Sequence, residues 1–153
     1  LNVDYIFHAT GTGGTMAGLA AGRKMAESDT KIISITVSPK DEKYLRKVEK
    51  LANDVLALIK SPAHVTIEED LHMDTGYYAP GYEQPNEAAS EAIRLLARTE
   101  GLFVDPVYTG KALAGLIDYV RSGKVPQGSN VVFWHTGGAT ALFAEHEILG
   151  KLY

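Results

Sequence analysis

Hydrophobic positions along the chain follow two patterns, short continuous runs and helical repeats. Continuous apolar or β-branched runs between turn residues are typical of buried strands. Such runs predict strands at residues 6–10, 31–37, 64–67 and 130–135. Apolar residues spaced three or four apart predict amphipathic helices instead. These helices are expected at residues 16–28, 41–59, 86–100 and 111–123, with a last helix after residue 138 that carries Leu142, Phe143 and Ile148.

Turn and cap residues divide these elements. Asn86 is expected to cap the helix that follows it, and Gly101 to end that helix. Residues 68–70 are three acidic residues and predict an exposed turn. Residues 72–85 fit no strand or helix period and are rich in tyrosine, glycine and proline. A long aromatic loop of this kind is more often functional than a plain connection.

Strands that alternate with helices predict an α/β fold, a three-layer, mostly parallel sheet with helices on both faces. Ligands bind such sheets beyond the carboxyl ends of the strands. That rule brings three glycine-bearing corners to one edge, at residues 10–15, 106–110 and 136–138. We therefore expect one ligand site built from these three corners.

The first corner predicts an anion site. Gly11, Gly13 and Gly14 let the backbone approach a ligand closely, and the following helix offers unpaired N–H groups to a phosphate. Hydroxyls surround the same point, on Thr10, Thr12 and Thr15. A dinucleotide fingerprint would need glycine at Met16, and neither a P-loop lysine nor a nucleophilic serine is present. The alternative is a corner that serves only tight packing between strand and helix.

Composition narrows the function classes. The chain has 153 residues, a net charge of -4 and 45% hydrophobic residues, as expected of one domain with a substantial core. The charge gives no reason to expect nucleic acid, and no apolar run or leader predicts a membrane span. Zero cysteines exclude disulfides and are consistent with a cytoplasmic protein. The five histidines show no metal-ligand spacing, so no metal is expected; His135 is interpreted as a packed, hydrogen-bonded residue and His146 as helix surface.

The corners also resemble a known family. Residues 11–15, Gly-Thr-Gly-Gly-Thr, are similar to the phosphate loop of fold-type II pyridoxal-phosphate enzymes, the tryptophan-synthase-β-like group. Residues 105–112 and 135–139 resemble the D-cysteine desulfhydrase and 1-aminocyclopropane-1-carboxylate deaminase branch of that group. Residues 79–82, Ala-Pro-Gly-Tyr, stand where that branch carries a tyrosine-bearing loop.

The resemblance implies a pyridoxal phosphate site. The loop from Thr10 to Thr15 would bind the cofactor phosphate, through the N–H groups of Gly11, Gly13 and Gly14 and the hydroxyls of Thr12 and Thr15. Thr136 would lie at the pyridine nitrogen, where a neutral hydroxyl leaves that nitrogen unprotonated. Tyr82 and Tyr108 would be the catalytic residues and would contact a small amino acid substrate together with Thr109.

Two positions favour one activity within the branch. In the motifs of the deaminases, glutamate and leucine occupy the positions that Thr109 and Thr136 hold here. Thr109 cannot stabilise a protonated pyridine as a carboxylate would. The expected reaction is α,β-elimination from D-cysteine to pyruvate, hydrogen sulfide and ammonia. The alternatives are a 1-aminocyclopropane-1-carboxylate deaminase, an L-cysteate sulfo-lyase and, in another class, a non-catalytic phosphate- or nucleotide-binding module.

The resemblance also implies that residues 1–153 are the C-terminal part of a cofactor-binding large domain. The family's small domain and its Schiff-base lysine segment have no counterpart in this chain. Lys111 is the one lysine expected near the site, and it does not match the Schiff-base position. We therefore expect the isolated chain to be inactive, and the full-length enzyme to be a homodimer.

Overall fold

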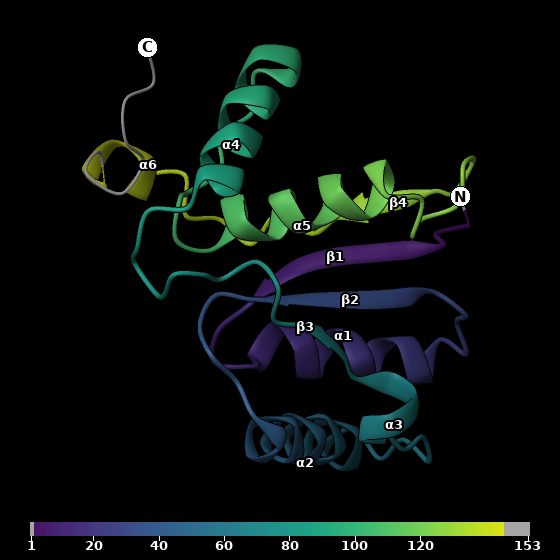
Figure 1. Ribbon diagram of the computed structural model, residues 1–153. Helices are drawn as coiled ribbons and strands as arrows, with labels where there is room; N and C mark the ends of the chain where they lie inside the picture. Colours follow the sequence, from purple (N-terminus) through teal and green to yellow (C-terminus); the bar gives the residue numbers. More distant parts are fainter. Residues whose placement is uncertain (1, 146–153) are drawn as a thin grey trace.

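One parallel sheet organises the computed structural model, which describes residues 2–145 (Figure 1). Its strands lie in the order β3-β2-β1-β4, and every neighbouring pair is parallel. Their bounds are Tyr5–Thr10 for β1, Lys31–Thr36 for β2, His72–Asp74 for β3 and Val131–Phe133 for β4. The expected α/β class with a parallel sheet is confirmed.

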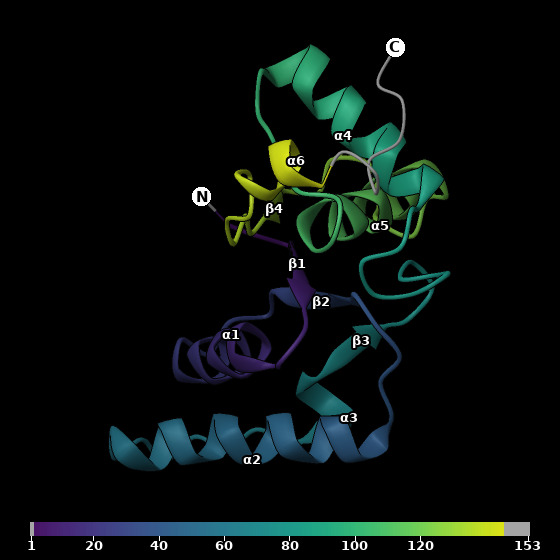
Figure 2. The same cartoon turned by 90° about the vertical axis from the view of Figure 1, so that its left-hand side faces the viewer.

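Helices cover both faces of the sheet (Figure 2). α1 (Gly14–Met25), α2 (Glu42–Leu58) and α3 (Ile67–Asp70) lie on one side. α4 (Glu87–Glu100), α5 (Thr109–Arg121) and α6 (Ala141–Ala144) lie on the other. α1 and α5 pack against the strands, whereas α2 and α4 pack chiefly on α1 and α5. Each face therefore carries an inner and an outer helix.

Small residues bring α5 close to the sheet. A Cβ added to Gly115 would lie 2.8 Å from Ile35 Cδ1, so a larger residue would force the Ile35 side chain or the helix to shift. Phe7 is fully buried in β1 between Ile33 and Phe133, and its ring meets that of Tyr119 edge to face at 5.2 Å. This core fixes α5, and with it the corner that begins the helix.

The cap residues act as the sequence predicted. The Asn86 side chain accepts a hydrogen bond from Ala89 N at 2.8 Å, and Gly101 ends α4 in the left-handed conformation, with φ of 68°. A further cap, which the sequence analysis did not identify, is Asp41, whose side chain accepts from Tyr44 N at 3.0 Å at the start of α2. No described helix, within residues 2–145, is long and apolar enough to cross a membrane.

The prediction of a strand at residues 64–67 is wrong. The backbone N–H of Val65 donates to the Asn53 side chain, and its C=O accepts from the same side chain, at 2.9 Å each. These two backbone groups therefore cannot bond to a strand of the sheet. Ile67 already belongs to helix α3, and the strand beside β2 is β3, inside the segment expected to be a loop. A short apolar run does not distinguish an edge strand from the extended segment and helix start that are present here.

The acidic turn at residues 68–70 is not wholly exposed either. Asp70 is buried, where it accepts hydrogen bonds from Arg23 at 2.6 Å and from Thr66 N at 2.8 Å. These partners explain its position, because a buried carboxylate needs them. At the other end of the chain, Ile148 and His146 lie outside the described residues.

Candidate functional site

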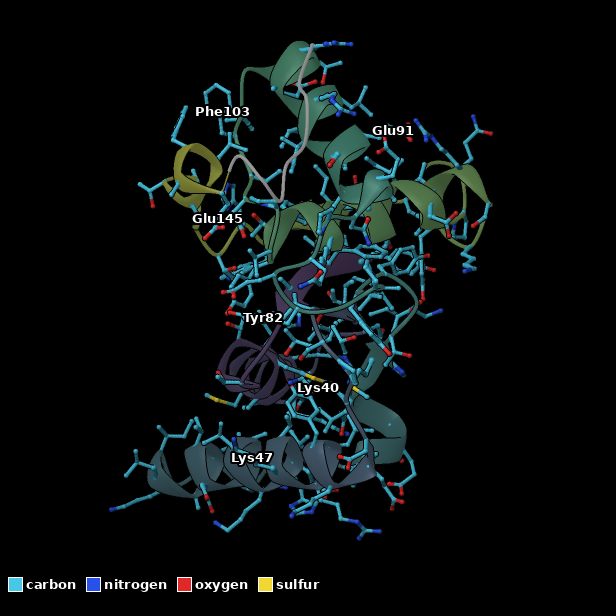
Figure 3. The ribbon with its side chains drawn as sticks, turned by 60° about the vertical axis from the view of Figure 1, so that its left-hand side comes forward. Lys40, Lys47, Tyr82, Glu91, Phe103 and Glu145 are labelled. Atoms are coloured by element: carbon cyan, nitrogen blue, oxygen red, sulfur yellow. The ribbon has the colours of Figure 1, made fainter. Side chains whose placement is uncertain are left out.

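A cleft of about 630 Å³ opens beyond the carboxyl ends of β1 and β2 (Figure 3). Figure 3 shows Tyr82 on the loop between β3 and α4, with Lys40, in the loop before α2, and Lys47, on α2, across from it. Six residues expected in a site line the cleft: Gly11, Thr12, Thr15, Tyr82, Tyr108 and Thr136. The topology thus brings together residues from across the chain at the predicted edge.

The glycine loop ends in an open helix N-terminus. Gly13 is the N-cap of α1 and has a φ of 98°, a conformation that disfavours any side chain. A Cβ there would also lie 2.7 Å from Val48 Cγ2. No side chain caps this end, and the first turn of α1 contains no acidic residue. The N–H groups and the positive end of the helix dipole are therefore left for an anion.

The three corners touch one another. A Cβ added to Gly11 would lie 3.2 Å from Tyr108 Cε1, which joins the first corner to the second. A Cβ added to Gly138 would lie 2.7 Å from Asp105 Oδ1, which joins the second to the third. A side chain at Gly138 would meet the Asp105 carboxylate and need a φ of 90°, whereas one at Gly11 would require the Tyr108 ring to shift by a few tenths of an ångström. The expected convergence of the three corners is present in the structure.

Asp105 builds the second corner. Its buried carboxylate accepts hydrogen bonds from the backbone N–H groups of Val107, Tyr108 and Thr109 at 2.7 to 2.9 Å. It also accepts from the Thr109 hydroxyl at 2.6 Å. A carboxylate that holds three successive N–H groups fixes the start of α5. The turn directs Tyr108 into the cleft.

Thr109, unlike Tyr108, does not face the cleft. It is fully buried, its hydroxyl donates to Asp105 and accepts from Asp105 N at 3.0 Å, and it does not line the cleft. The structure therefore gives no support to its expected contact with substrate. Thr10 is similar, since its buried hydroxyl is bonded to that of Tyr44 at 2.8 Å. Both threonines support the walls of the site.

Tyr82 and Tyr108 form a pair at the cleft. Their hydroxyls are hydrogen-bonded, and their rings meet edge to face with centroids 5.7 Å apart. The hydrogen bond to Tyr108 raises the pKa of Tyr82 to about 12, with a smaller contribution from burial. A raised pKa means that the protonated form of Tyr82 is stabilised by the pair. Either hydroxyl can donate the shared hydrogen bond, which leaves the O–H of the other for a further partner.

The third corner places Thr136 on the cleft lining. The His135 ring holds this turn, because Nε2 donates to Phe103 O at 2.9 Å and Nδ1 accepts from Gly137 N at 3.1 Å. His135 is exposed, but it is hydrogen-bonded as the sequence analysis expected. Gly137 and Gly138 follow with φ of 100° and 90°. Both glycines allow the tight turn that presents Thr136.

The sequence analysis missed the cationic wall of the cleft. Lys40, Tyr44 and Lys47 also line it, and the Lys40 ammonium lies 5.0 Å from the Tyr44 ring centroid. A signal was present, since Lys43 and Lys47 are four residues apart at the start of the helix that follows β2, and Lys40 lies just before that helix.

Lys111 is not the one lysine near the site, and that expectation is wrong. Lys40 and Lys47 line the cleft, whereas Lys111 is fully buried beside it. Burial lowers the pKa of Lys111, and the nearby charge of Asp105 partly offsets this effect. Its ammonium donates to the carbonyls of Tyr78 and Gly81.

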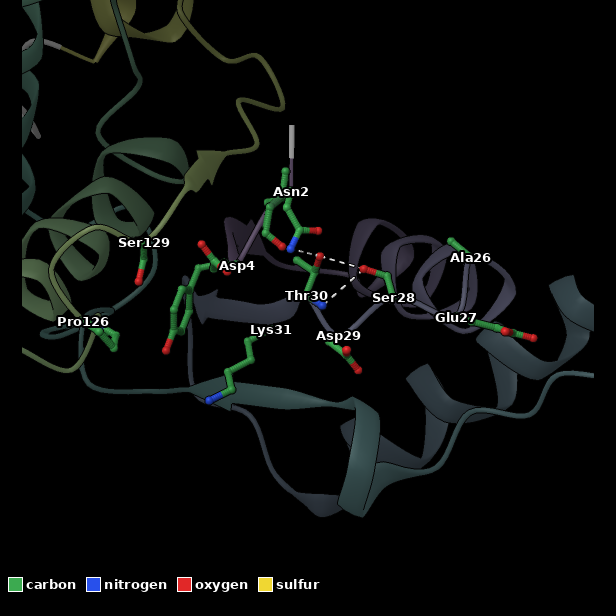
Figure 4. Close-up of a pocket in the computed structure, with 12 residues that line it drawn as sticks. Asn2, Asp4, Ala26, Glu27, Ser28, Asp29, Thr30, Lys31, Pro126 and Ser129 are labelled. Carbon is green, nitrogen blue, oxygen red and sulfur yellow. Dashed lines mark hydrogen bonds between the residues drawn. The ribbon is translucent and has the colours of Figure 1, made fainter.

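A second cavity, of about 520 Å³, lies at the opposite edge, beside the amino ends of β1 and β2 (Figure 4). Asp4, Glu27 and Asp29 give it a mostly negative lining, against the one cation of Lys31. The Thr30 hydroxyl there is already bonded to Ser28 and to Val3 O. The negative charge of this cavity is unsuited to a phosphate.

Among residues 2–145, no cluster of three histidine, cysteine or acidic side chains is arranged to hold a metal.

Comparisons with known proteins agree with the geometry of the cleft. Residues 1–137 match the family described as pyridoxal-phosphate dependent enzyme. The chain is 44% identical over 141 residues to the D-cysteine desulfhydrases of Salmonella typhi and Salmonella newport (strain SL254). This match covers 90% of the chain and 41% of each relative. A crystal structure of an ACC deaminase homologue superposes with a TM-score of 0.85 at 32% identity, over 97% of this chain and 44% of that one. The chain therefore spans less than half the length of these relatives.

Proposed function

The chain belongs to the family of pyridoxal-phosphate-dependent enzymes, and on this premise we propose that it contributes the phosphate-binding part of a D-cysteine desulfhydrase site. The enzyme would convert D-cysteine and water to pyruvate, hydrogen sulfide and ammonia. One observation carries the proposal, the meeting of the glycine loop, the tyrosine pair and Thr136 in a single cleft. Similarity to D-cysteine desulfhydrases supports the choice of substrate.

The residues present fit the cofactor's phosphate. The left-handed Gly13 and the uncapped first turn of α1 leave N–H donors at the base of the cleft. The hydroxyls of Thr12 and Thr15 would add two donors, and Lys40 and Lys47 would add positive charge. Pyridoxal phosphate, when bound, supplies an electron sink for the substrate's α-carbon.

Thr136 would contact the pyridine nitrogen. Its place in the cleft lining and the rigid turn around His135 support this role. A hydroxyl donates to an unprotonated nitrogen, whereas a carboxylate would stabilise a protonated one. The site would therefore withdraw electrons moderately, which suits elimination better than transamination.

The tyrosine pair would manage the proton on the leaving sulfur. The two hydroxyls share a hydrogen bond, and either of them can be its donor. When Tyr82 donates to the Tyr108 oxygen, the Tyr108 O–H would be free to donate to the departing sulfur. Thiolate is a better leaving group when a donor neutralises its charge as the bond breaks.

We also propose that the lysine which binds the cofactor covalently lies in a segment that corresponds to the unmatched part of the relatives. The relatives are more than twice as long as the matched region, which supports this arrangement. The buried Lys111 faces loop carbonyls, which argues against that role for it. The isolated chain would then show no turnover. The whole enzyme would be a cytoplasmic homodimer, consistent with the absence of cysteine.

The test compares this chain with a longer polypeptide that also contains the segments its relatives have. We expect pyridoxal phosphate to give a shifted absorbance band with the longer form only, and D-cysteine to release sulfide and pyruvate. Release of 2-oxobutanoate from 1-aminocyclopropane-1-carboxylate, or of sulfite from L-cysteate, would favour those relatives' activities instead. Failure of both forms to bind pyridoxal phosphate, with reversible nucleotide binding by this chain, would favour the binding module.

A further inference from the structure

The loop that carries Tyr82 has little regular structure, yet its carbonyl groups are closely held. Residues 75–85 contain no helix or strand, so their carbonyls have no sheet or helix partners. Buried or half-buried carbonyls of this kind need other donors. Two side chains from outside the loop tip supply them, Lys111 and Asn86.

Lys111 holds the loop from α5. Its ammonium donates to Tyr78 O at 3.1 Å and to Gly81 O at 2.7 Å. Gly81 O belongs to the peptide bond that Tyr82 completes, so this contact orients the backbone from which Tyr82 projects. Lys111 is the only lysine of residues 2–145 with a fully buried side chain, and no carboxylate of the described chain bonds to it.

Asn86 holds the same loop from α4. Its amide nitrogen donates to Tyr77 O at 3.0 Å and to Ala79 O at 2.6 Å. Its amide oxygen caps α4 through Ala89 N. Four carbonyls between Tyr77 and Gly81 are thus held by two side chains, which we call the carbonyl clamp.

We propose that the carbonyl clamp, Lys111 together with Asn86, positions Tyr82 against Tyr108. Tyr108 is the N-cap residue of α5, and Lys111 lies in the first turn of the same helix. Lys111 therefore ties the backbone that carries Tyr82 to the helix at whose start Tyr108 lies. A buried ammonium costs desolvation that an apolar side chain of similar length would avoid, so stability alone gives little reason for a lysine here. The role of the carbonyl clamp in catalysis rests on the proposed function, whereas its effect on the order of the loop does not.

The first test measures loop order in the full-length protein. We compare Lys111→Met, which keeps the chain length without donors, with Asn86→Asp, which keeps the cap oxygen and loses the amide donors. Hydrogen exchange of peptides covering residues 76–83 should become at least about tenfold faster in each variant, with the remaining peptides unchanged. Lys50→Met is the matched control, because Lys50 is exposed on α2 and pairs only with Asp54. Unchanged exchange in the loop would overturn the clamp.

The second test separates positioning from general stabilisation in the holoenzyme. Lys111→Met should leave the pyridoxal phosphate band in place and lower kcat about a hundredfold, since small misplacements have effects of this size. In a Tyr82→Phe background the same substitution should have almost no further effect, because positioning acts only through the Tyr82 hydroxyl. Equal losses in both backgrounds would show that Lys111 acts on the fold and not through Tyr82.

A third variant covers failure of Lys111→Met to fold. Lys111→Gln keeps a shorter donor group and should give intermediate exchange rates and an intermediate kcat. If the unchanged protein binds no pyridoxal phosphate, the proposed function fails, yet the exchange experiment still decides whether the clamp orders the loop. The two proposals therefore fail separately.

Discussion

The hydroxyls of Tyr82 and Tyr108 share one hydrogen bond, although the two residues lie on different elements and 26 positions apart in the chain. Tyr82 comes from the loop before α4, and Tyr108 from the start of α5. The pair joins the two sides of the upper wall of the cleft. The geometry of this hydrogen bond depends on two neighbouring features, the turn built by Asp105 and the carbonyl clamp that holds the loop.

Removal of the Tyr108 hydroxyl should lower catalysis more than cofactor binding. Tyr108→Phe takes away the group proposed to donate a proton to the leaving sulfur. We expect kcat to fall about 10²- to 10³-fold, the usual range for a lost general acid, while the cofactor band is retained. Sulfide release from D-cysteine measures the change. Tyr5→Phe, which removes a hydroxyl far from the cleft, should leave kcat within about twofold.

The same substitution should change the titration of Tyr82. Its pKa of about 12 lies above the ordinary value because the hydrogen bond with Tyr108 and, to a smaller extent, burial favour the neutral hydroxyl. Tyr82 should therefore stay protonated as the pH rises through about 10, and ionise only near 12. In Tyr108→Phe its pKa should fall toward the ordinary value. NMR of ¹³C-labelled tyrosine, assigned with Tyr82→Phe, measures this pKa. An unmoved pKa would contradict the stabilisation of neutral Tyr82 by Tyr108.

Gly13→Ala should weaken phosphate binding and the fold together. The residue would need a φ of 98°, and its Cβ would lie 2.7 Å from Val48 Cγ2. We expect a loss of about 1 to 3 kcal/mol in the free energy of unfolding and at least tenfold weaker binding of pyridoxal phosphate. Gly14→Ala is the matched control, since a Cβ there meets nothing within 4 Å. Equal effects at the two positions would refute this account.

The cationic wall should contribute a salt-dependent part of the affinity. Lys40→Ala and Lys47→Ala each remove an ammonium from the cleft lining. We expect the Kd for pyridoxal phosphate to rise about three- to tenfold at about 0.05 M salt, and much less at about 0.5 M, where screening is strong. Lys50→Ala, on the same helix but away from the cleft, is the control. An effect independent of salt would assign the lysines a packing role instead.

Asp70 should make stability depend on acid pH. Burial alone would raise the pKa of its carboxyl, but the bonds from Thr66 N, Lys24 and Arg23 outweigh burial and lower it. A lowered pKa in the folded state means that the stabilisation is present above the unfolded value near 4 and is lost as pH falls through the folded value. Asp70→Asn should cost about 3 kcal/mol at pH 7, because it leaves Arg23 without its buried partner.

Urea unfolding at neutral and at acid pH measures this contribution. The difference between the unchanged protein and Asp70→Asn should shrink as the pH falls below about 4. Glu69→Gln is the control, since Glu69 is exposed and its contact with Lys24 is 3.3 Å long. A constant difference at every pH would show that the asparagine acts through packing.

Local sequence determined the elements whose signals lie within a few residues. The strand–glycine–helix corner, the Asn86 cap and the Gly101 helix end could all be predicted, because periodicity and turn chemistry act over one or two turns. The parallel topology then followed from the alternation of elements, and with it the meeting of three corners at one edge.

Tertiary structure alone decided which polar groups face the cleft and which are buried. Thr109 turns inward to Asp105, Lys111 reaches loop carbonyls 30 and 33 residues away, and Asp70 pairs with Arg23 across 47 residues. Asn53 likewise takes the backbone of Val65, which the local pattern assigned to a strand. These outcomes depend on partners that only the folded chain brings close, and the energy of a buried polar group depends on those partners more than on its neighbours in sequence.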